Sequence, residues 1–183
     1  MNALNRRPLL HWLVASTLAF SAHTAWSQAT AWPAAGPIKL VVPFTPGSGT
    51  DVMARVLAEK LGPALGQQVV VENKPGAGGT VGAAQVAKSA ADGYTLLVHS
   101  SGHVVNPALY PKLAYDTLKD FDGITPLASL PNVLVVAPSK GYKDVADLVA
   151  KVKAQPDKLF YASAGNGSAT HMNAEQFRVV AGL

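Results

Sequence analysis

This sequence predicts an α/β fold built on a parallel β-sheet. Apolar runs rich in β-branched residues alternate with stretches of helical periodicity, and glycine-rich turns connect the two kinds of segment. That order of strand, turn and helix is typical of parallel sheets. Of the 183 residues 49% are hydrophobic and the formal net charge is only +4. A chain of this composition has enough apolar surface to fold around a core, so we do not expect disorder.

The N-terminal segment is predicted to lie outside this fold. Arg6 and Arg7 precede an almost wholly apolar run at 9–20, and a small residue follows at Ser27. Such an order is typical of a secretory signal peptide. The apolar run falls short of the about 20 residues that cross a bilayer, so a retained anchor is the weaker interpretation. We predict that residues 1–27 are a signal peptide and that the mature protein is exported.

Composition excludes several kinds of site. The chain has no cysteine, which rules out disulfides, thiolate nucleophiles and iron–sulfur clusters. No stripe of Lys and Arg with interleaved aromatic residues is present, so we expect no nucleic acid partner. His99 and His103 are four apart, but the Ser-Ser-Gly between them argues against a helix and no carboxylate lies nearby in sequence. We therefore expect no metal ion and no cofactor.

The first predicted strand covers 38–43, and a helix follows at 51–65, where apolar residues recur at helical spacing. The residues expected to face inward are Val52, Val56, Leu57 and Leu61. The residues expected on the solvent face are four apart: Asp51, Arg55 and Glu59.

The next two strands are predicted at 68–72 and 95–99, and a helix at 81–90 lies between them with Thr80 as its N-cap. The second half of the chain repeats this pattern. Its predicted strands and helices are strands 123–128, 132–137 and 159–162 and helices 144–154 and 170–181. The residues of helix 144–154 expected to face inward are Val145, Leu148, Val149 and Val152. Pro126 and Pro131 break the chain between two strands and mark the expected crossover between two lobes.

Three glycine-rich turns are candidates for a binding site, because ligands of parallel sheets bind beyond the carboxyl ends of the strands. They lie at 43–51, 73–83 and 163–171. Glycine lets the backbone approach a ligand closely, and the free N–H groups of a following helix attract an anion. Each turn alone is equally well explained as a tight connection. The three together favour a binding function.

Individual side chains in these turns also have ordinary structural interpretations. Asp51 is more simply explained as a partner of Arg55 at the start of a helix than as a ligand contact. Ser168 and Thr170 are expected to cap the last helix, a role that does not exclude contact with a ligand.

Motifs of common enzyme classes are absent from the sequence. No turn carries the lysine of a phosphate-binding loop, and the dinucleotide fingerprint fails at Val81, where Gly or Ala is required. The Gly-x-Ser-x-Gly elbow is also missing. The residues therefore show no recognisable catalytic motif. They leave open a secreted hydrolase-like enzyme that pairs Ser48 or Ser168 with His103 or His171.

Five segments together resemble a known family. VVPFTPGSGTD, VENKPGAGGTVGA, DGYTLLV, NPALYPKLAYD and YASAGNGSATH are similar to the periplasmic substrate-binding receptors of tripartite tricarboxylate transporters, the Bug family. The resemblance implies an α/β, two-lobed periplasmic binding protein (type II-like). It also implies a periplasmic receptor, and not an enzyme, that closes on a small organic carboxylate and delivers it to the membrane permease subunits of the transporter.

Ligand contacts are implied by the same resemblance. In the first lobe they are Phe44, Thr45, Gly47, Ser48, Gly49, Thr50 and Asp51. In the second lobe they are Ser163, Gly165, Gly167, Ser168 and His171. The family holds a ligand carboxylate with backbone N–H groups, hydroxyls and waters, which suits two turns without Arg or Lys. Ser48 is a departure, because it replaces one of the family's consecutive glycines and brings a side chain into the approach path.

The resemblance also implies a division of the chain, with a first α/β lobe at 28–129 and a partial second lobe at 130–183. Family members continue well beyond the helix that ends near Leu183, so we expect an incomplete second lobe and weaker binding than in a complete receptor. A truncated receptor without function is the remaining alternative.

Overall fold

The computed structural model describes residues 31–183, so the predicted signal peptide at 1–27 lies outside the described residues. Within the described part, Trp32–Leu183 forms one compact unit. The lobe boundary expected at 129/130 stays a prediction.

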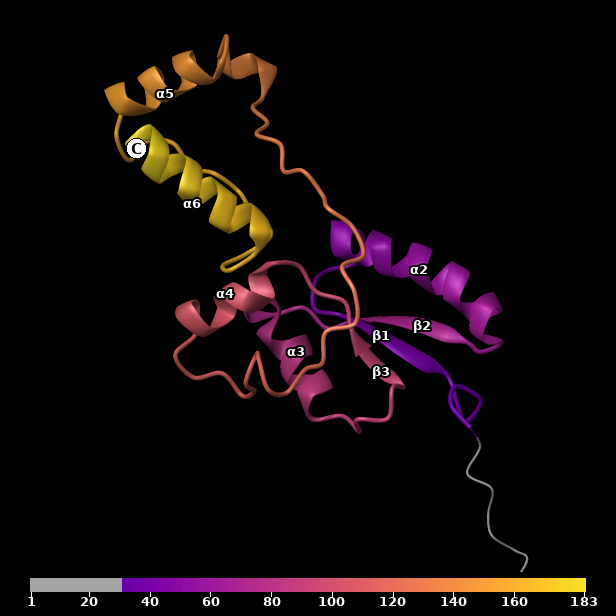
Figure 1. Ribbon diagram of the computed structural model, residues 1–183. Helices are drawn as coiled ribbons and strands as arrows, with labels where there is room; N and C mark the ends of the chain where they lie inside the picture. The colour runs from indigo at the N-terminus through magenta and orange to yellow at the C-terminus, as the bar shows by residue number, and fades with distance from the viewer. Residues whose placement is uncertain (1–30) are drawn as a thin grey trace, which may run out of the picture. The chain divides into compact units, whose positions relative to one another are not determined.

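A three-stranded parallel sheet is the centre of the fold (Figure 1). Its strands are β1 (Ile38–Val42), β2 (Val69–Asn73) and β3 (Thr95–Leu97), in the order β2-β1-β3. β1 is central, and its apolar side chains are almost wholly buried. The chain crosses from β1 to β2 through α2 (Gly49–Leu65) and returns past β1 to β3 through α3 (Thr80–Ala87). Because the two crossovers run in opposite directions, the helices cover opposite faces of the sheet, which confirms the parallel α/β prediction.

α2 presents a different face to the core than its apolar spacing predicts. Val52 and Val56 are about half exposed, whereas Ala54 is buried and Leu57 packs against the core. Asp51, expected on the solvent face, is only 2% exposed. The prediction is wrong here because hydrogen bonds to the neighbouring loop and β2 hold Asp51 inward, and they fix the rotation of the whole helix.

α3 begins without the predicted cap. Thr80 is its first residue, and the N-cap position belongs to Gly79, whose φ of +92° lies in the left-handed region. The preceding turn, η1 (Ala77–Gly79), is a single 3₁₀ turn. Glycine backbone geometry therefore leads the chain into the helix, and no side-chain cap is made.

α4 (Gly102–Leu109) is a helix that the sequence does not predict. It begins just after the Ser-Ser pair, so His103 lies on the helix and His99 precedes it. Gly102 and Pro107 both disfavour helix, which hides α4 from propensity arguments. Its buried Asn106 shows that tertiary packing, and not local preference, holds the helix.

The strands predicted at 123–128, 132–137 and 159–162 are absent from the described residues, and this prediction is wrong. These segments have no regular secondary structure and no pairing partner, and most of their apolar side chains are exposed: Val133 by 78% and Phe160 by 94%. β-branched composition favours extended backbone, but a strand needs a neighbour for its hydrogen bonds. Residues 31–183 provide no such neighbour at these positions.

The helices of the last third end close to their predicted limits. α5 (Val145–Ala154) is capped by Asp144, which accepts a hydrogen bond from the Asp147 amide at 2.7 Å. The short turn η2 (Pro138–Lys140) precedes it, and α6 (Ala169–Ala181) ends the chain. No residue of α5 is fully buried. The predicted inward face is wrong at Val145, which is exposed, whereas Leu148, Val149 and Val152 are half-buried. Among residues 31–183 no helix has both the length and the apolar character to cross a membrane.

Candidate functional site

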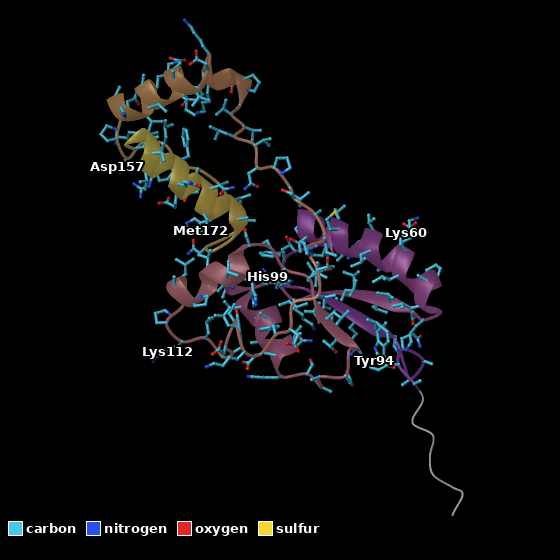
Figure 2. The ribbon with its side chains drawn as sticks, in the orientation of Figure 1. Lys60, Tyr94, His99, Lys112, Asp157 and Met172 are labelled. Atoms are coloured by element: carbon cyan, nitrogen blue, oxygen red, sulfur yellow. The ribbon has the colours of Figure 1, made fainter. Side chains whose placement is uncertain are left out.

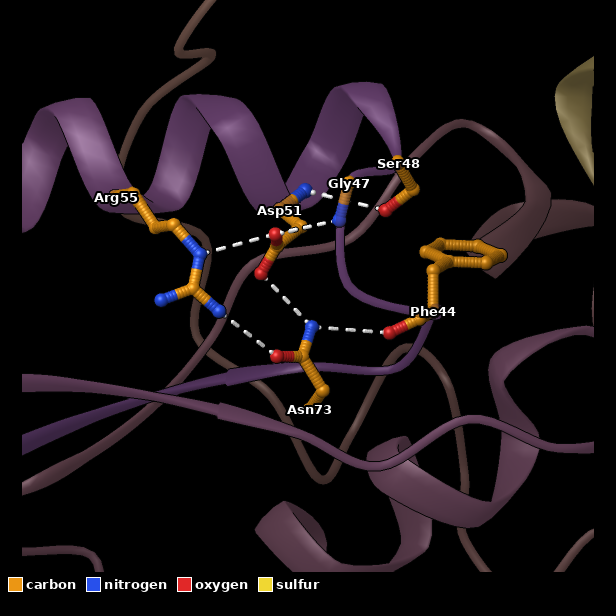
Figure 3. Close-up of polar contacts among 6 residues, drawn as sticks. All are labelled: Phe44, Gly47, Ser48, Asp51, Arg55 and Asn73. Atoms are coloured by element: carbon orange, nitrogen blue, oxygen red, sulfur yellow. Dashed lines mark hydrogen bonds and ion pairs between the residues drawn. The ribbon is translucent and has the colours of Figure 1, made fainter.

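Asp51 organises the loop that leads from β1 into α2 (Figure 3). Its Oδ2 accepts hydrogen bonds from the Gly47 amide at 2.8 Å and from Nε of Arg55 at 3.0 Å. Its Oδ1 accepts from Nδ2 of Asn73 at 2.8 Å, and the same nitrogen donates to the Phe44 carbonyl at 3.1 Å. One buried carboxylate thus joins the first turn, α2 and the end of β2.

The charge of Asp51 is stabilised by these donors. The hydrogen bond from Arg55, followed by those from Gly47 and Asn73, lowers the pKa of the Asp51 carboxyl to about 2. Arg55 also donates to Oδ1 of Asn73 at 3.1 Å, which closes the network. The structural role that the sequence suggests for Asp51 as a partner of Arg55 is confirmed.

A pocket of about 350 Å³ lies where the three glycine-rich turns meet. Its lining residues come from the ends of β1 and β2, from α4 and from the turn before α6: Pro43, Phe44, Thr45, Ser48, Pro75, Gly76, Ala77, Gly78, Gly79, Tyr110, Ala164, Gly165 and Asn166. The strand order reverses between β1 and β3, and ligands of such sheets bind at that reversal, beyond the carboxyl ends of the strands. The convergence that the sequence suggests is therefore present.

Neutral groups make up the whole lining of this pocket. No Lys, Arg, Asp or Glu side chain is among its lining residues. The available donors are backbone N–H groups, the hydroxyls of Thr45 and Ser48, and the side-chain amide of Asn166. Such a surface suits a small polar or anionic ligand held by several directed hydrogen bonds.

The residues that the sequence analysis names as ligand contacts divide into two groups. Those that line the pocket are Phe44, Thr45, Ser48 and Gly165. Those outside its lining are Gly47, Gly49, Thr50, Asp51, Ser163, Gly167, Ser168 and His171. Several of the second group shape the turns: the Gly167 amide donates to Nδ1 of His171 at 3.3 Å, and the His171 amide donates to Oγ of Ser168 at 3.2 Å.

Part of the lining is absent from the contacts that the sequence implies. The turn Pro75–Gly79 belongs to one of the three candidate turns but not to those contacts, which also include neither Tyr110 nor Asn166. Tyr110 donates a hydrogen bond to the Asn166 carbonyl at 3.2 Å, which joins α4 to the third turn. The tyrosine lies within the family-like segment NPALYPKLAYD, so that segment was the available signal.

A cluster of rings lies behind the first turn. His99, labelled in Figure 2, packs edge-on against Phe44 with ring centroids 5.2 Å apart, and His103 lies 5.0 Å from His99. Burial lowers the pKa of His99 to about 4, so its ring is neutral near pH 7. Its Nδ1 lies 3.0 Å from the Ser100 carbonyl, which assigns the proton to Nδ1. The cluster therefore supports the wall of the pocket as a packed, uncharged unit.

Neither candidate serine is hydrogen-bonded to an imidazole in the described part of the chain. Oγ of Ser48 accepts from the Asp51 amide at 3.3 Å, and Oγ of Ser168 lies 3.1 Å from Oγ1 of Thr170. Nucleophilic catalysis needs a base bonded to the hydroxyl. Nothing in this arrangement favours the hydrolase alternative. Residues 31–183 also contain no group of three side chains able to hold a metal ion.

Known proteins are similar to this chain in sequence and in fold. Residues 53–183 match the family model described as tripartite tricarboxylate transporter family receptor. BugT of Bordetella pertussis is 44% identical over 150 residues, which cover 81% of this chain and 46% of BugT. The chain therefore spans about half the length of the curated relatives it matches.

Three solved structures share the fold. The periplasmic binding protein BugD is 33% identical with a TM-score of 0.67, and the aligned region covers 81% of this chain and 50% of BugD. A Rhodopseudomonas palustris protein solved with adipate is 37% identical with a TM-score of 0.79, and the aligned region covers 84% of this chain and 51% of that protein. MatC of the same species, solved with malate, is 35% identical with a TM-score of 0.76, and the aligned region covers 82% of this chain and 51% of MatC.

These matches support both the fold and the family. The described residues have the α/β fold of periplasmic binding proteins and align with about half of each such structure. The family match covers well over half of this chain. The chain belongs to the family of tripartite tricarboxylate transporter receptors, which includes the Bug proteins.

Proposed function

We propose that this protein is an extracytoplasmic solute receptor that binds a small organic carboxylate and delivers it to the permease of a tripartite tricarboxylate transporter. The observation that carries the proposal is the neutral, donor-rich pocket where three turns meet. Its volume falls at the lower end of the range of small-molecule sites. The relatives solved with adipate and malate support a carboxylate as the class of ligand.

The first turn supplies the proposed carboxylate donors. Thr45 and Ser48 present hydroxyls to the pocket, and Phe44 supplies an apolar wall. The partial positive charge at the start of α2 adds a favourable field for an anion. Because these donors are fixed by the fold, they need no net positive charge to hold a carboxylate.

The remaining predicted contacts act from behind this surface. Asp51 fixes the Gly47 amide and the Phe44 carbonyl through its network. Ser168 and His171 fix the third turn, from which Gly165 reaches the pocket. Under this proposal they position the turns, and the ligand contacts belong to the residues that line the pocket.

Ligand binding tests the function directly. We expect adipate or malate at 100 times its dissociation constant to raise the thermal midpoint by roughly 5–10 °C, because a ligand that binds only the folded state stabilises it. An amine of similar size serves as the control and is expected to leave the midpoint unchanged. NMR of the same mixtures reports turnover. Absence of any shift across a panel of organic acids contradicts the receptor, and product formation supports the enzyme instead.

Thr45→Val tests the first turn. The change keeps the shape of an exposed side chain and removes its hydroxyl, so we expect roughly 2- to 10-fold weaker carboxylate binding with unchanged stability. Thr125→Val is the matched control, since Thr125 is exposed and is not among the lining residues. Titration calorimetry measures both. Equal affinities for the two variants would remove Thr45 from the site.

Export is a further part of the proposal. We expect the protein in the periplasmic fraction of cells that express it, with Gln28 as the first residue of the mature chain. Fractionation and N-terminal sequencing test this expectation. A chain that stays with the cytoplasm, or that keeps residues 1–27, contradicts it.

A further inference from the structure

One face of α4 packs against the backbone of the third turn. Gly102, Asn106 and Leu109 follow one another at helical spacing, and Tyr110 continues the same face at the end of the helix. A side chain added at Gly167 would meet Oδ1 of Asn106 at 3.1 Å and Cδ1 of Leu109 at 3.2 Å. The third turn therefore lies directly on this face.

Two glycines allow this close approach. A Cβ on Gly102 would overlap the carbonyl oxygen of Gly167, and a Cβ on Gly78 would overlap the carbonyl oxygen of Asn166. Gly102 is buried within regular helix and has no unusual backbone angle, so the helix itself does not require glycine there. The absence of a side chain at Gly102 serves the packing of the turn.

Hydrogen bonds complete the contact. The Tyr110 hydroxyl donates to the Asn166 carbonyl at 3.2 Å. Asn106, which is fully buried, directs Nδ2 toward the Gly78 carbonyl at 3.4 Å. The α4 face and the second turn are thus tied to each other and to the third turn.

We propose that Gly78, Gly102, Asn106 and Tyr110 form a seat that sets the position of the third turn across the pocket, and that Gly102 and Tyr110 are positioning residues for ligand binding. This inference rests on the proposed carboxylate site. Ala164, Gly165 and Asn166 line the pocket immediately before the seated glycine. A shift of the turn by about 1 Å is enough to misalign its donors with a ligand fixed by the first turn.

Gly102→Ala tests the seat with little effect on α4. Alanine is the best helix former, so the helix is retained while its methyl group pushes the Gly167 carbonyl away. We expect at least about tenfold weaker binding of adipate and malate. Gly62→Ala is the matched control: Gly62 also lies within a helix, but a Cβ there meets its nearest neighbour, the Gln67 carbonyl oxygen, at 3.4 Å, which is ordinary contact.

Tyr110→Phe tests the hydrogen bond alone. The ring stays and the donor is lost, so we expect roughly 2- to 10-fold weaker binding of both acids and an unchanged thermal midpoint without ligand. Tyr142→Phe is the control, because Tyr142 precedes α5 and does not line the pocket. A purely structural role for Tyr110 predicts the opposite pattern, with a lower midpoint and unchanged affinity.

A distance measurement tests, without any ligand, whether the seat sets the position of the third turn. The chain has no cysteine of its own, so spin labels can be attached to cysteines introduced at two exposed sites, Val104 on α4 and Val179 on α6. We expect a narrow distance distribution in the parent protein that shifts or broadens with Gly102→Ala. A distance distribution that Gly102→Ala leaves unchanged overturns the seat. If the parent protein binds, equal affinity of the parent and Gly102→Ala overturns it as well. Failure of the parent to bind any acid of the panel contradicts the proposed function, and the distances then decide the seat alone.

Discussion

Replacing Gly79 with alanine is expected to destabilise the protein by about 2–4 kcal/mol and to weaken carboxylate binding at least tenfold. Gly79 has φ +92°, a conformation that costs an L-residue energy. A Cβ there would also overlap Nε2 of His99 and come within 3.3 Å of Cγ of Pro43. Gly79 and Pro43 both line the pocket, so the displacement reaches the site itself.

Gly66→Ala separates the cost of backbone strain from the cost of overlap between an added Cβ and its neighbours. Gly66 also has a left-handed φ, +61°, but a Cβ there meets nothing within 4 Å. We expect a loss of about 1 kcal/mol from backbone strain alone and no change in binding. Urea denaturation gives the stabilities and calorimetry the affinities. If the two variants lose equal stability and both bind normally, the contact between Gly79 and His99 has no role in shaping the pocket.

The predictable part of the fold is the part in which local pattern and tertiary packing agree. β1, β2, β3 and α2 fall within a few residues of their predicted limits. The strands are short apolar runs, α2 has helical periodicity, and glycine or proline lies within a few residues of each element. α4 was missed since Gly102 and Pro107 disfavour helix and only its packing favours it. The strand predicted at 132–137 is the opposite case, because local pattern favours it and packing does not. Its valines favour a strand, but no partner strand lies in the described residues.

The candidate site was predictable to a similar degree. The glycine-rich turns after β1 and β2 meet at one edge of the sheet, as the topology β2-β1-β3 explains. The third turn follows no strand in the described residues, and it reaches the pocket through its packing on α4. The rotation of α2 was not predictable, because the inward position of Asp51 depends on Asn73, far along the chain. Tyr110 was missed for the same reason, since its partner Asn166 belongs to another segment.

Asp51→Asn is expected to lower the thermal midpoint at pH 7 by roughly 4–8 °C, because it breaks a buried hydrogen-bonded network. Every contact of the Asp51 carboxylate uses it as an acceptor, from Gly47, Arg55 and Asn73. An asparagine amide places a donor where one of these donors already points. The first turn is then released, and carboxylate binding should weaken along with stability.

The pH dependence of this difference identifies its electrostatic part. The pKa of Asp51 is lowered to about 2 by its hydrogen bonds, first of all the one from Arg55. A carboxyl whose pKa is lowered on folding stabilises the protein above the pKa of the unfolded chain, about 4, and loses that contribution as pH falls through the folded value. The gap in midpoint between parent and Asp51→Asn should therefore be full above about pH 4 and should narrow between about pH 4 and 2.

Asp147→Asn provides the matched control for this result. Asp147 pairs with Lys151 in the same four-residue spacing on α5, with its Oδ2 at 2.8 Å from the lysine Nζ, but the pair lies at the surface. Surface ion pairs contribute little, so we expect a small change in midpoint. Equal losses for Asp51→Asn and Asp147→Asn would show that burial of the Asp51 carboxylate adds nothing to the pair. A difference in midpoint between parent and Asp51→Asn that does not change with pH below 4 would show that the charge of this carboxylate does not contribute. The expected contrast instead assigns the stability of the first turn to the solvent-shielded contacts of Asp51.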